Sequence, residues 1–84
     1  MYDYYFTFRS ITAAQRGERA LQKENLHCSL QRAPKYLAVK GCGYALKVRS
    51  GEALAAAAAL GLWEIEYGKI YRVGLDGSVE ETVL

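Results

Sequence analysis

Residues 2–8 read Tyr2-Asp3-Tyr4-Tyr5-Phe6-Thr7-Phe8, a run in which every even position is aromatic. Alternation with period two is typical of a β-strand that buries one face, and aromatic residues are enriched in strands. We therefore expect residues 2–8 to form a strand whose even-numbered side chains face the core.

Similar patterns predict further elements along the chain. Small and apolar residues recur at helical spacing after Ser10 or Thr12 and again after Ser50, and hydroxyl side chains are good helix N-caps. The sequence predicts helices over residues 12–24 and 50–61, strands over residues 26–31, 44–48 and 63–67, and a β-hairpin over residues 69–83 with Asp76-Gly77 as a type I′ turn.

This order is β-α-β-β-α-β followed by a hairpin, the pattern of ferredoxin-like domains. The expected fold class is α+β, a two-layer sandwich with strand order 4-1-3-2 and both helices on one face. We expect a single domain, 1–84, with a ferredoxin-like core at 1–68 and a C-terminal hairpin extension at 69–84. The other sheet face is expected to be polar and accessible, formed by Tyr5, Thr7, His27, Ser29, Lys47, Glu64 and Glu66.

The chain has 84 residues, and 12 of its apolar residues are alanine, so its core is thin. A domain of this size buries only about 60% of its unfolded surface and is marginally stable. We therefore expect a homodimer, with the hairpin covering the open sheet face of its own subunit or of a neighbour. A monomer whose hairpin folds back over Tyr5 and His27 is the competing outcome.

Charge is distributed unevenly along the chain. Residues 1–49 carry nine Lys and Arg against three acidic residues, whereas residues 50–84 carry two against six. Residues 32–49 contain five basic residues and no acid. Basic and aromatic residues do not interleave as they do in proteins that stack bases, so we expect no nucleic acid partner. With no apolar stretch near 20 residues and no signal-peptide pattern, we expect a cytoplasmic protein without a membrane span.

The two cysteines have different surroundings. Cys28 shares a predicted strand face with Leu26 and Leu30, so we expect it to be buried, while neighbouring His27 points to the open face. Cys42 lies between two glycines within the basic segment, and positive charge favours the nucleophilic thiolate. A reactive thiol and a plain tight turn are both compatible with this pattern. The spacing of the cysteines and the single histidine support no metal site, and no nucleotide or hydrolase motif occurs.

Several stretches together resemble a known family. They are Tyr4-Tyr5-Phe6-Thr7-Phe8-Arg9-Ser10, then Ala13-Ala14, Glu18, Leu21 and Pro34, then Cys42-Gly43-Tyr44-Ala45-Leu46-Lys47-Val48. Over roughly residues 2–71 the chain resembles small bacterial proteins described as selenium/sulfur carrier-like. The most specific part is the Cys-Gly-x-Ala-Leu-basic-Val run at 42–48.

The resemblance implies that Cys42 carries a persulfide or selenosulfide and passes it to an acceptor by thiol exchange. The implied partners are sulfur or selenium donor and acceptor proteins, and no cofactor or metal is required. Two glycines would allow a bulky donor to approach and four basic side chains would stabilise the anionic persulfide: Gly41, Gly43, Arg32, Lys35, Lys40 and Lys47.

A second interpretation belongs to another functional class. A ferredoxin-like domain can be a non-catalytic dimerisation or regulatory module, which would use the open sheet face or the apolar run Tyr36-Leu37-Ala38-Val39 for contacts. Both interpretations favour a carrier or a binding protein over a turnover enzyme. The reactivity of the Cys42 thiol distinguishes them.

Overall fold

The chain forms an antiparallel sheet with helices packed against it. We describe residues 2–35 and 43–84 of a computed structural model. Within these ranges the elements are β1 (Tyr2–Phe8), α1 (Ile11–Lys23), β2 (Ser29–Arg32), β3 (Tyr44–Arg49), α2 (Ser50–Leu62), β4 (Ile70–Gly74) and β5 (Val79–Thr82). The strands lie in the order β2-β3-β1-β4-β5, and each neighbouring pair is antiparallel. The expected α+β class is confirmed.

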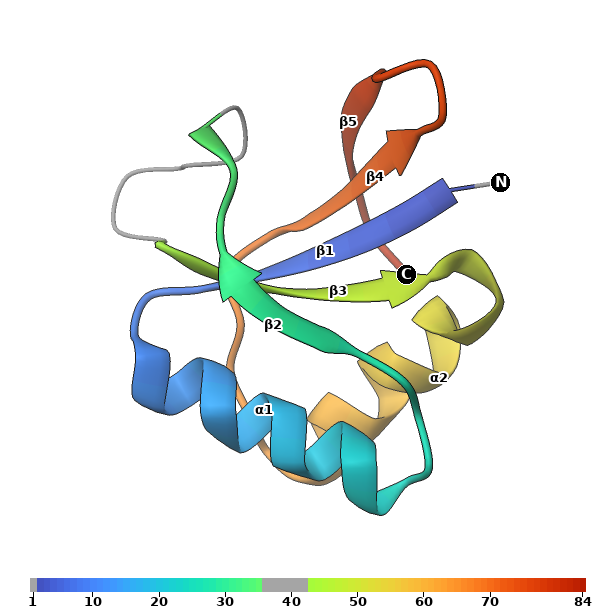
Figure 1. Ribbon diagram of the computed structural model, residues 1–84. Helices are drawn as coiled ribbons and strands as arrows, with labels where there is room; N and C mark the ends of the chain where they lie inside the picture. The colour runs from blue at the N-terminus through green and yellow to red at the C-terminus, as the bar shows by residue number, and fades with distance from the viewer. Residues whose placement is uncertain (1, 36–42) are drawn as a thin grey trace.

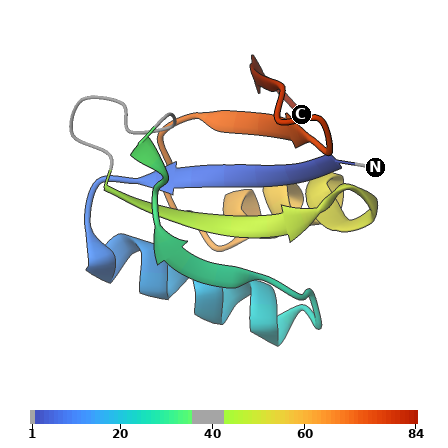
Figure 2. The same ribbon diagram turned by 45° about the horizontal axis from the view of Figure 1, so that its top comes forward.

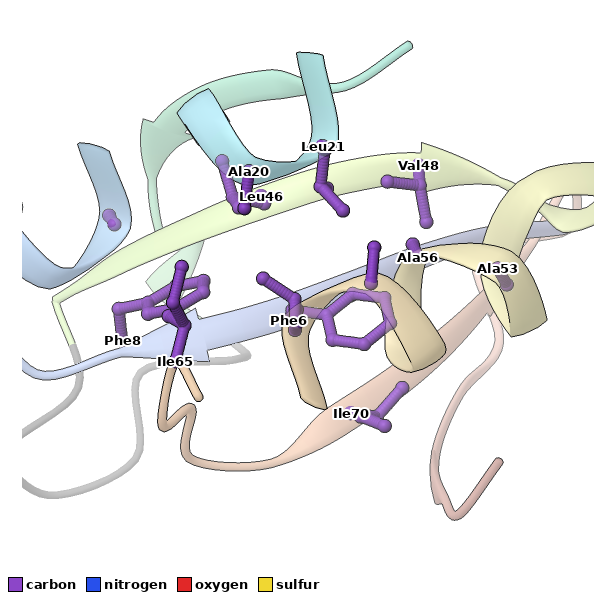
Figure 3. Close-up of a cluster of buried hydrophobic side chains, with 13 residues drawn as sticks. Phe6, Phe8, Ala20, Leu21, Leu46, Val48, Ala53, Ala56, Ile65 and Ile70 are labelled. Carbon is purple, nitrogen blue, oxygen red and sulfur yellow. The ribbon is translucent and has the colours of Figure 1, made fainter. Parts of the chain in front are cut away.

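Both helices cover the same face of the sheet (Figure 1), as expected from the sequence. Figure 2 shows β4, β1, β3 and β2 side by side with the helices beneath them. The main core fills the space between these layers (Figure 3). Phe6 and Phe8 of β1 and Leu46 and Val48 of β3 point toward the helices and are almost completely buried. The predicted burial of even-numbered side chains is therefore confirmed for Phe6 and Phe8, whereas Tyr2 is exposed.

The two helices begin differently. The side-chain oxygen of Ser10 accepts a hydrogen bond from the backbone N–H of Ala13 at 3.1 Å, which caps α1 as expected. The cap residue of α2 is Arg49, whose side chain makes no cap hydrogen bond, and Ser50 is already helical. The expected Ser50 cap is therefore wrong. Neither α1 nor α2 is long and apolar enough to cross a bilayer.

The strand expected over residues 26–31 starts later than predicted. After α1, Asn25 adopts a φ of 60°, and the N–H of Leu26 donates to the carbonyl of Leu21 at 2.9 Å. This is the bonding of a Schellman motif, which ends a helix and turns an apolar residue back onto it. Leu26 thus belongs to the helix terminus, and β2 begins only at Ser29.

The strand expected over residues 63–67 is wrong for the same physical reason. Glu64 follows α2 with a φ of 55°, and the N–H of Ile65 donates to the carbonyl of Leu60 at 2.9 Å. Ile65 is buried in the core, and the ring of Tyr67 meets that of Phe6 edge-on with centroids 5.2 Å apart. Ile65 and Tyr67 contact the core because of the turn that ends α2, and their spacing of two residues is the same as that of a strand.

The fourth strand of the sheet is instead the first strand of the C-terminal hairpin. β4 pairs with β1, with Ile70 opposite Phe6, so the expected order 4-1-3-2 is present with residues 70–74 as its fourth strand. β5 lies outside β4, at the edge of the described sheet. The hairpin is therefore part of the sheet and does not fold back over it.

The hairpin turn has one residue more than expected. Arg72 lies opposite Glu80, and the N–H of Gly74 donates to the carbonyl of Ser78 at 2.9 Å, which leaves a three-residue loop. A type I′ turn needs positive φ at both central residues, but only Gly77, with a φ of 85°, has it. The Asp76 carboxylate accepts from the N–H of Ser78 instead, and this bond lowers the pKa of Asp76.

The sheet face away from the helices is less polar than expected. Tyr5 and Ala45 are buried there, with Tyr71, Val73 and Ala33 packed against them. Thr7 is fully buried, and its hydroxyl donates to the carbonyl of Lys69 and accepts from its N–H. Ser29 and Lys47 do pair across this face, but Glu64 and Glu66 lie outside the strands. The expectation of a uniformly polar, accessible face is wrong.

Candidate functional site

The connection between β2 and β3 contains the cysteine that the sequence singled out. Cys42 lies outside the described residues, together with the candidates Lys40 and Gly41 and the apolar run at 36–39. Its flanks are described. The N–H of Ala33 donates to the carbonyl of Gly43 at 3.0 Å, which extends the β2–β3 ladder beyond Arg32 and Tyr44. The chain therefore leaves and re-enters the sheet at one point, at the β2–β3 end seen in Figure 2.

The described flanks are open and positively charged. The guanidinium of Arg32 lies 5.7 Å from the ring centroid of Tyr44, a cation–π contact that holds the cation beside the start of β3. Lys35 is also exposed, three residues after Arg32 on the same flank. A Cβ atom added to Gly43 would meet nothing within 4 Å, so space is free on that side of the backbone. The contact with Tyr44 was missed in the sequence because it depends on the strand register.

Lys47 has other neighbours than the sequence suggested. Its Nζ lies 3.6 Å from the Asp3 carboxylate. In the β2–β3 ladder Lys47 lies opposite Ser29, whereas Arg32 lies opposite Tyr44, so Lys47 is away from the basic flank. It lines an open pocket of about 400 Å³ formed by Asp3, His27, Cys28, Ser29, Lys47, Val48 and Arg49. The structure thus brings Arg32, Lys35 and Gly43 to one end of the β2–β3 pair and places Lys47 toward the other.

Cys28 lines the same pocket as Lys47 and is a half-buried free thiol packed against the core. Burial raises its pKa to about 11, and the nearby carboxylates of Glu18 and Glu52 act in the same direction. At neutral pH this side chain is a thiol and a poor nucleophile. The expectation that Cys28 packs with Leu26 and Leu30 against the core is met, although its burial is incomplete.

His27 does not point onto the open sheet face. Its side chain is 92% exposed, with Nδ1 3.5 Å from the Glu52 carboxylate at the start of α2. Its backbone N–H also donates to Glu52 at 3.4 Å. Within residues 2–35 and 43–84 no three His, Cys, Asp or Glu side chains are placed to hold a metal ion.

The residues that flank the β2–β3 connection are basic, and space is free beside Gly43. The Cys28 thiol, at the other end of these strands, is protonated at neutral pH. Comparison with known proteins finds a family model, described as "Putative Se/S carrier protein-like", that matches residues 3–72 and so spans β1 through most of β4, including Cys42. No curated protein and no solved structure matches the chain. A family match over this much of the sequence establishes that the chain belongs to the Se/S carrier protein-like family.

Proposed function

We propose that this protein is a sulfur or selenium carrier in which Cys42 holds the transferred atom as a persulfide or selenosulfide. The observation that carries the proposal is the family match, which includes Cys42 within residues 3–72. Cys28, the other cysteine of the chain, is a poor candidate because burial keeps it protonated. The proposed function requires no metal and no cofactor.

The transfer step is a thiol exchange. The Cys42 thiolate attacks the outer sulfur of a donor persulfide, R–S–SH. A new S–S bond forms at Cys42, the S–S bond of the donor breaks, and the donor leaves as the thiolate R–S⁻. The proton stays on the transferred sulfur, and the exchange has no net oxidation or reduction. Delivery repeats the step with an acceptor thiolate as the attacking group, and a selenosulfide follows the same balance.

The residues around Cys42 have separate proposed roles. Arg32, Lys35 and Lys40 stabilise the thiolate and the anionic persulfide, since nearby positive charge favours the charged form of a thiol. The free space beside Gly43 supports its role in letting a bulky donor approach, and we propose the same for Gly41. Lys47, paired with Asp3, contributes to the positive field more weakly.

We further propose that the architecture is a ferredoxin-like sandwich with β5 added at one edge, and that the protein acts in the cytoplasm. The strand order and the two helices on one face support the first part. A reducing compartment would keep the Cys42 thiol available, which supports the second. Cys28 and Gly43 lie at opposite ends of the β2–β3 pair, about 17 Å apart at strand spacing. A disulfide from Cys28 to Cys42 of the same chain is therefore not expected.

The test compares the two thiols in a matched pair of variants, Cys28→Ser and Cys42→Ser. At pH 7 to 8 we expect Cys28→Ser, which retains Cys42, to be alkylated faster than free cysteine. We expect Cys42→Ser to react more slowly than free cysteine, with a rate that rises as the pH approaches the Cys28 pKa of about 11. Incubation with a small-molecule persulfide should add the mass of one sulfur atom to Cys28→Ser only.

Two results would contradict the carrier. One is alkylation of Cys42 no faster than that of free cysteine, and the other is sulfur transfer that survives in Cys42→Ser. Either would favour the non-catalytic binding module. Transfer that depends on Cys42 and is weakened by Arg32→Gln would support both the cysteine and its proposed basic neighbour.

We also propose a homodimer formed through the hairpin. β5 lies at an edge of the described sheet, and both Val79, its first residue, and Val83, which follows it, are exposed. Strands at a sheet edge present backbone groups that can pair with a second copy. Sedimentation at micromolar concentration should give a dimer, and a chain ending at Ser78, which keeps β4, should be monomeric. A full-length chain that stays monomeric on concentration would rule out the dimer.

A further inference from the structure

A concave basic site lies on α1, apart from the cysteine connection. The pocket has a volume of about 170 Å³ and is lined by Arg16, Arg19, Ala20, Lys23, Trp63 and Ile65. The three cations come from α1, while Trp63 and Ile65 come from the segment that follows α2. Figure 1 shows the end of α2 running beside α1.

Helical spacing and the helix terminus together build this site. Arg16, Arg19 and Lys23 follow one another at steps of three and four residues, which puts them on one face of α1. The Schellman turn after α2 buries Ile65 and leaves the Trp63 ring beside that face. Lys23 Nζ lies 5.0 Å from the Trp63 ring centroid.

The three cations have no carboxylate partner among the described residues. The ion pairs there join His27 to Glu52, Lys47 to Asp3, Lys69 to Glu81 and Arg72 to Glu80. Residues 1 and 36–42 contain no Asp or Glu that could supply one. Trp63 is 39% exposed, and its Nε1 donates to the Glu24 carboxylate at 3.4 Å. The pocket therefore combines three cations that form no ion pair within the described residues with an accessible aromatic ring.

We propose that this pocket binds an acidic segment of a partner protein. Carboxylates of the segment would pair with Arg16 and Arg19, because guanidinium groups match carboxylates in two-point hydrogen bonds. An apolar side chain of the segment would lie on Trp63 beside Ile65. Trp and Arg are the residue types that most often dominate protein interfaces. The inference does not depend on Cys42, so it stands or fails separately from the carrier function.

A protein partner fits this site better than a nucleic acid. Arg16 and Lys23 are seven residues apart, so the cations span only about 10 Å along the helix. Nucleic acid binding draws on broad basic surfaces that neutralise many phosphates. Three clustered cations can neutralise only a few phosphates, which favours a short acidic segment over a nucleic acid.

The experiment uses Trp63 as the reporter, since it is the single tryptophan of the chain. The full-length protein is titrated with a capped peptide of alternating Glu and Leu, and Trp63 fluorescence is recorded. We expect a saturable change that weakens with added salt. The capped Lys and Leu counterpart should give none, and a single-stranded oligonucleotide of equal charge should bind more weakly than the acidic peptide.

Charge reversal locates the binding. The double variant Arg16→Glu with Arg19→Glu should lose about tenfold or more in affinity for the acidic peptide. Its matched control reverses two exposed arginines outside the pocket, Arg9→Glu with Arg49→Glu, and should change the affinity by less than about twofold. Circular dichroism checks that both variants are folded.

Four results would overturn the inference. They are no saturable change in Trp63 fluorescence up to millimolar peptide, an equal loss in both double variants, binding of the Lys and Leu peptide, and tighter binding of the oligonucleotide. The neutral pair Arg16→Gln with Arg19→Gln gives an independent check. It should bind more weakly than the natural chain and more tightly than the reversed pair.

Discussion

The two helices have the same inner face and different outer faces. Each has 13 residues, and each buries its fourth, seventh, tenth and eleventh residues. In α1 these are Ala14, Gly17, Ala20 and Leu21, and in α2 they are Ala53, Ala56, Ala59 and Leu60. In both helices three small residues allow close approach to the sheet, and one leucine fills the core. Both then end in a Schellman motif.

The outer faces have nothing comparable in common. α1 presents Arg16, Arg19 and Lys23, whereas α2 presents alanines with Leu54 and Leu62 exposed. The inner face must fit the same sheet, so packing fixes its side-chain sizes. The outer face is turned away from the sheet and exposed, so its side chains can contact a partner molecule. The buried positions that the two helices share are therefore explained by packing, whereas the exposed positions in which they differ are candidates for partner binding.

The largest expected effect tests the inner face. Leu21→Ala and Leu60→Ala should each lower the free energy of unfolding by about 2–5 kcal/mol, because each leaves a cavity in a packed core. Leu62 is 74% exposed on the same helix as Leu60, so Leu62→Ala should change stability by less than about 0.5 kcal/mol. Urea unfolding measures all three. Equal losses for Leu60 and Leu62 would contradict the assignment of inner and outer faces.

A second, smaller effect comes from the same change, glycine to alanine, made once in each helix. A Cβ at Gly17 would lie 3.0 Å from Leu46 Cδ1 and from Phe8 Cζ, both in buried side chains, so Gly17→Ala should destabilise by about 1–3 kcal/mol. A Cβ at Gly61 meets nothing within 4 Å, so Gly61→Ala should stabilise α2 by up to about 1 kcal/mol. Thermal unfolding of the pair should give shifts of opposite sign. Shifts of the same sign would mean that the sheet can yield beneath α1.

Local patterns predicted most of the fold. β1, α1, β3 and α2 were predictable because their periods and lengths depend on nearby residues. The fourth strand was misplaced because a helix terminus at Glu64 can bury Ile65 at strand-like spacing. The left-handed residue that makes this turn is a glutamate, which carries no signal in the sequence, since glycine or asparagine is usual there.

Of the two candidate sites, one could be found from local sequence and the other depends on tertiary packing. Cys42 was singled out from its neighbours in the sequence and by family resemblance, and its role stays a prediction. The basic pocket was not predictable, because Trp63 reaches α1 only through the turn after α2 and the packing of the two helices. Likewise, the separation of Lys47 from Arg32 depends on the strand register.

The smallest predicted effect concerns the two helix ends. Glu64 holds a φ of 55°, a left-handed conformation that costs a residue with a Cβ about 1–2 kcal/mol and costs asparagine less. Glu64→Gly should therefore stabilise by about 1 kcal/mol at most, and Asn25→Gly, at a φ of 60°, should gain less. Ala58 is exposed on α2 and has ordinary right-handed helical backbone angles. Ala58→Gly is therefore the matched control and should destabilise by about 1 kcal/mol. If Glu64→Gly loses stability as Ala58→Gly does, the two helices do not share the same ending, and the inner-face likeness stops at Leu21 and Leu60.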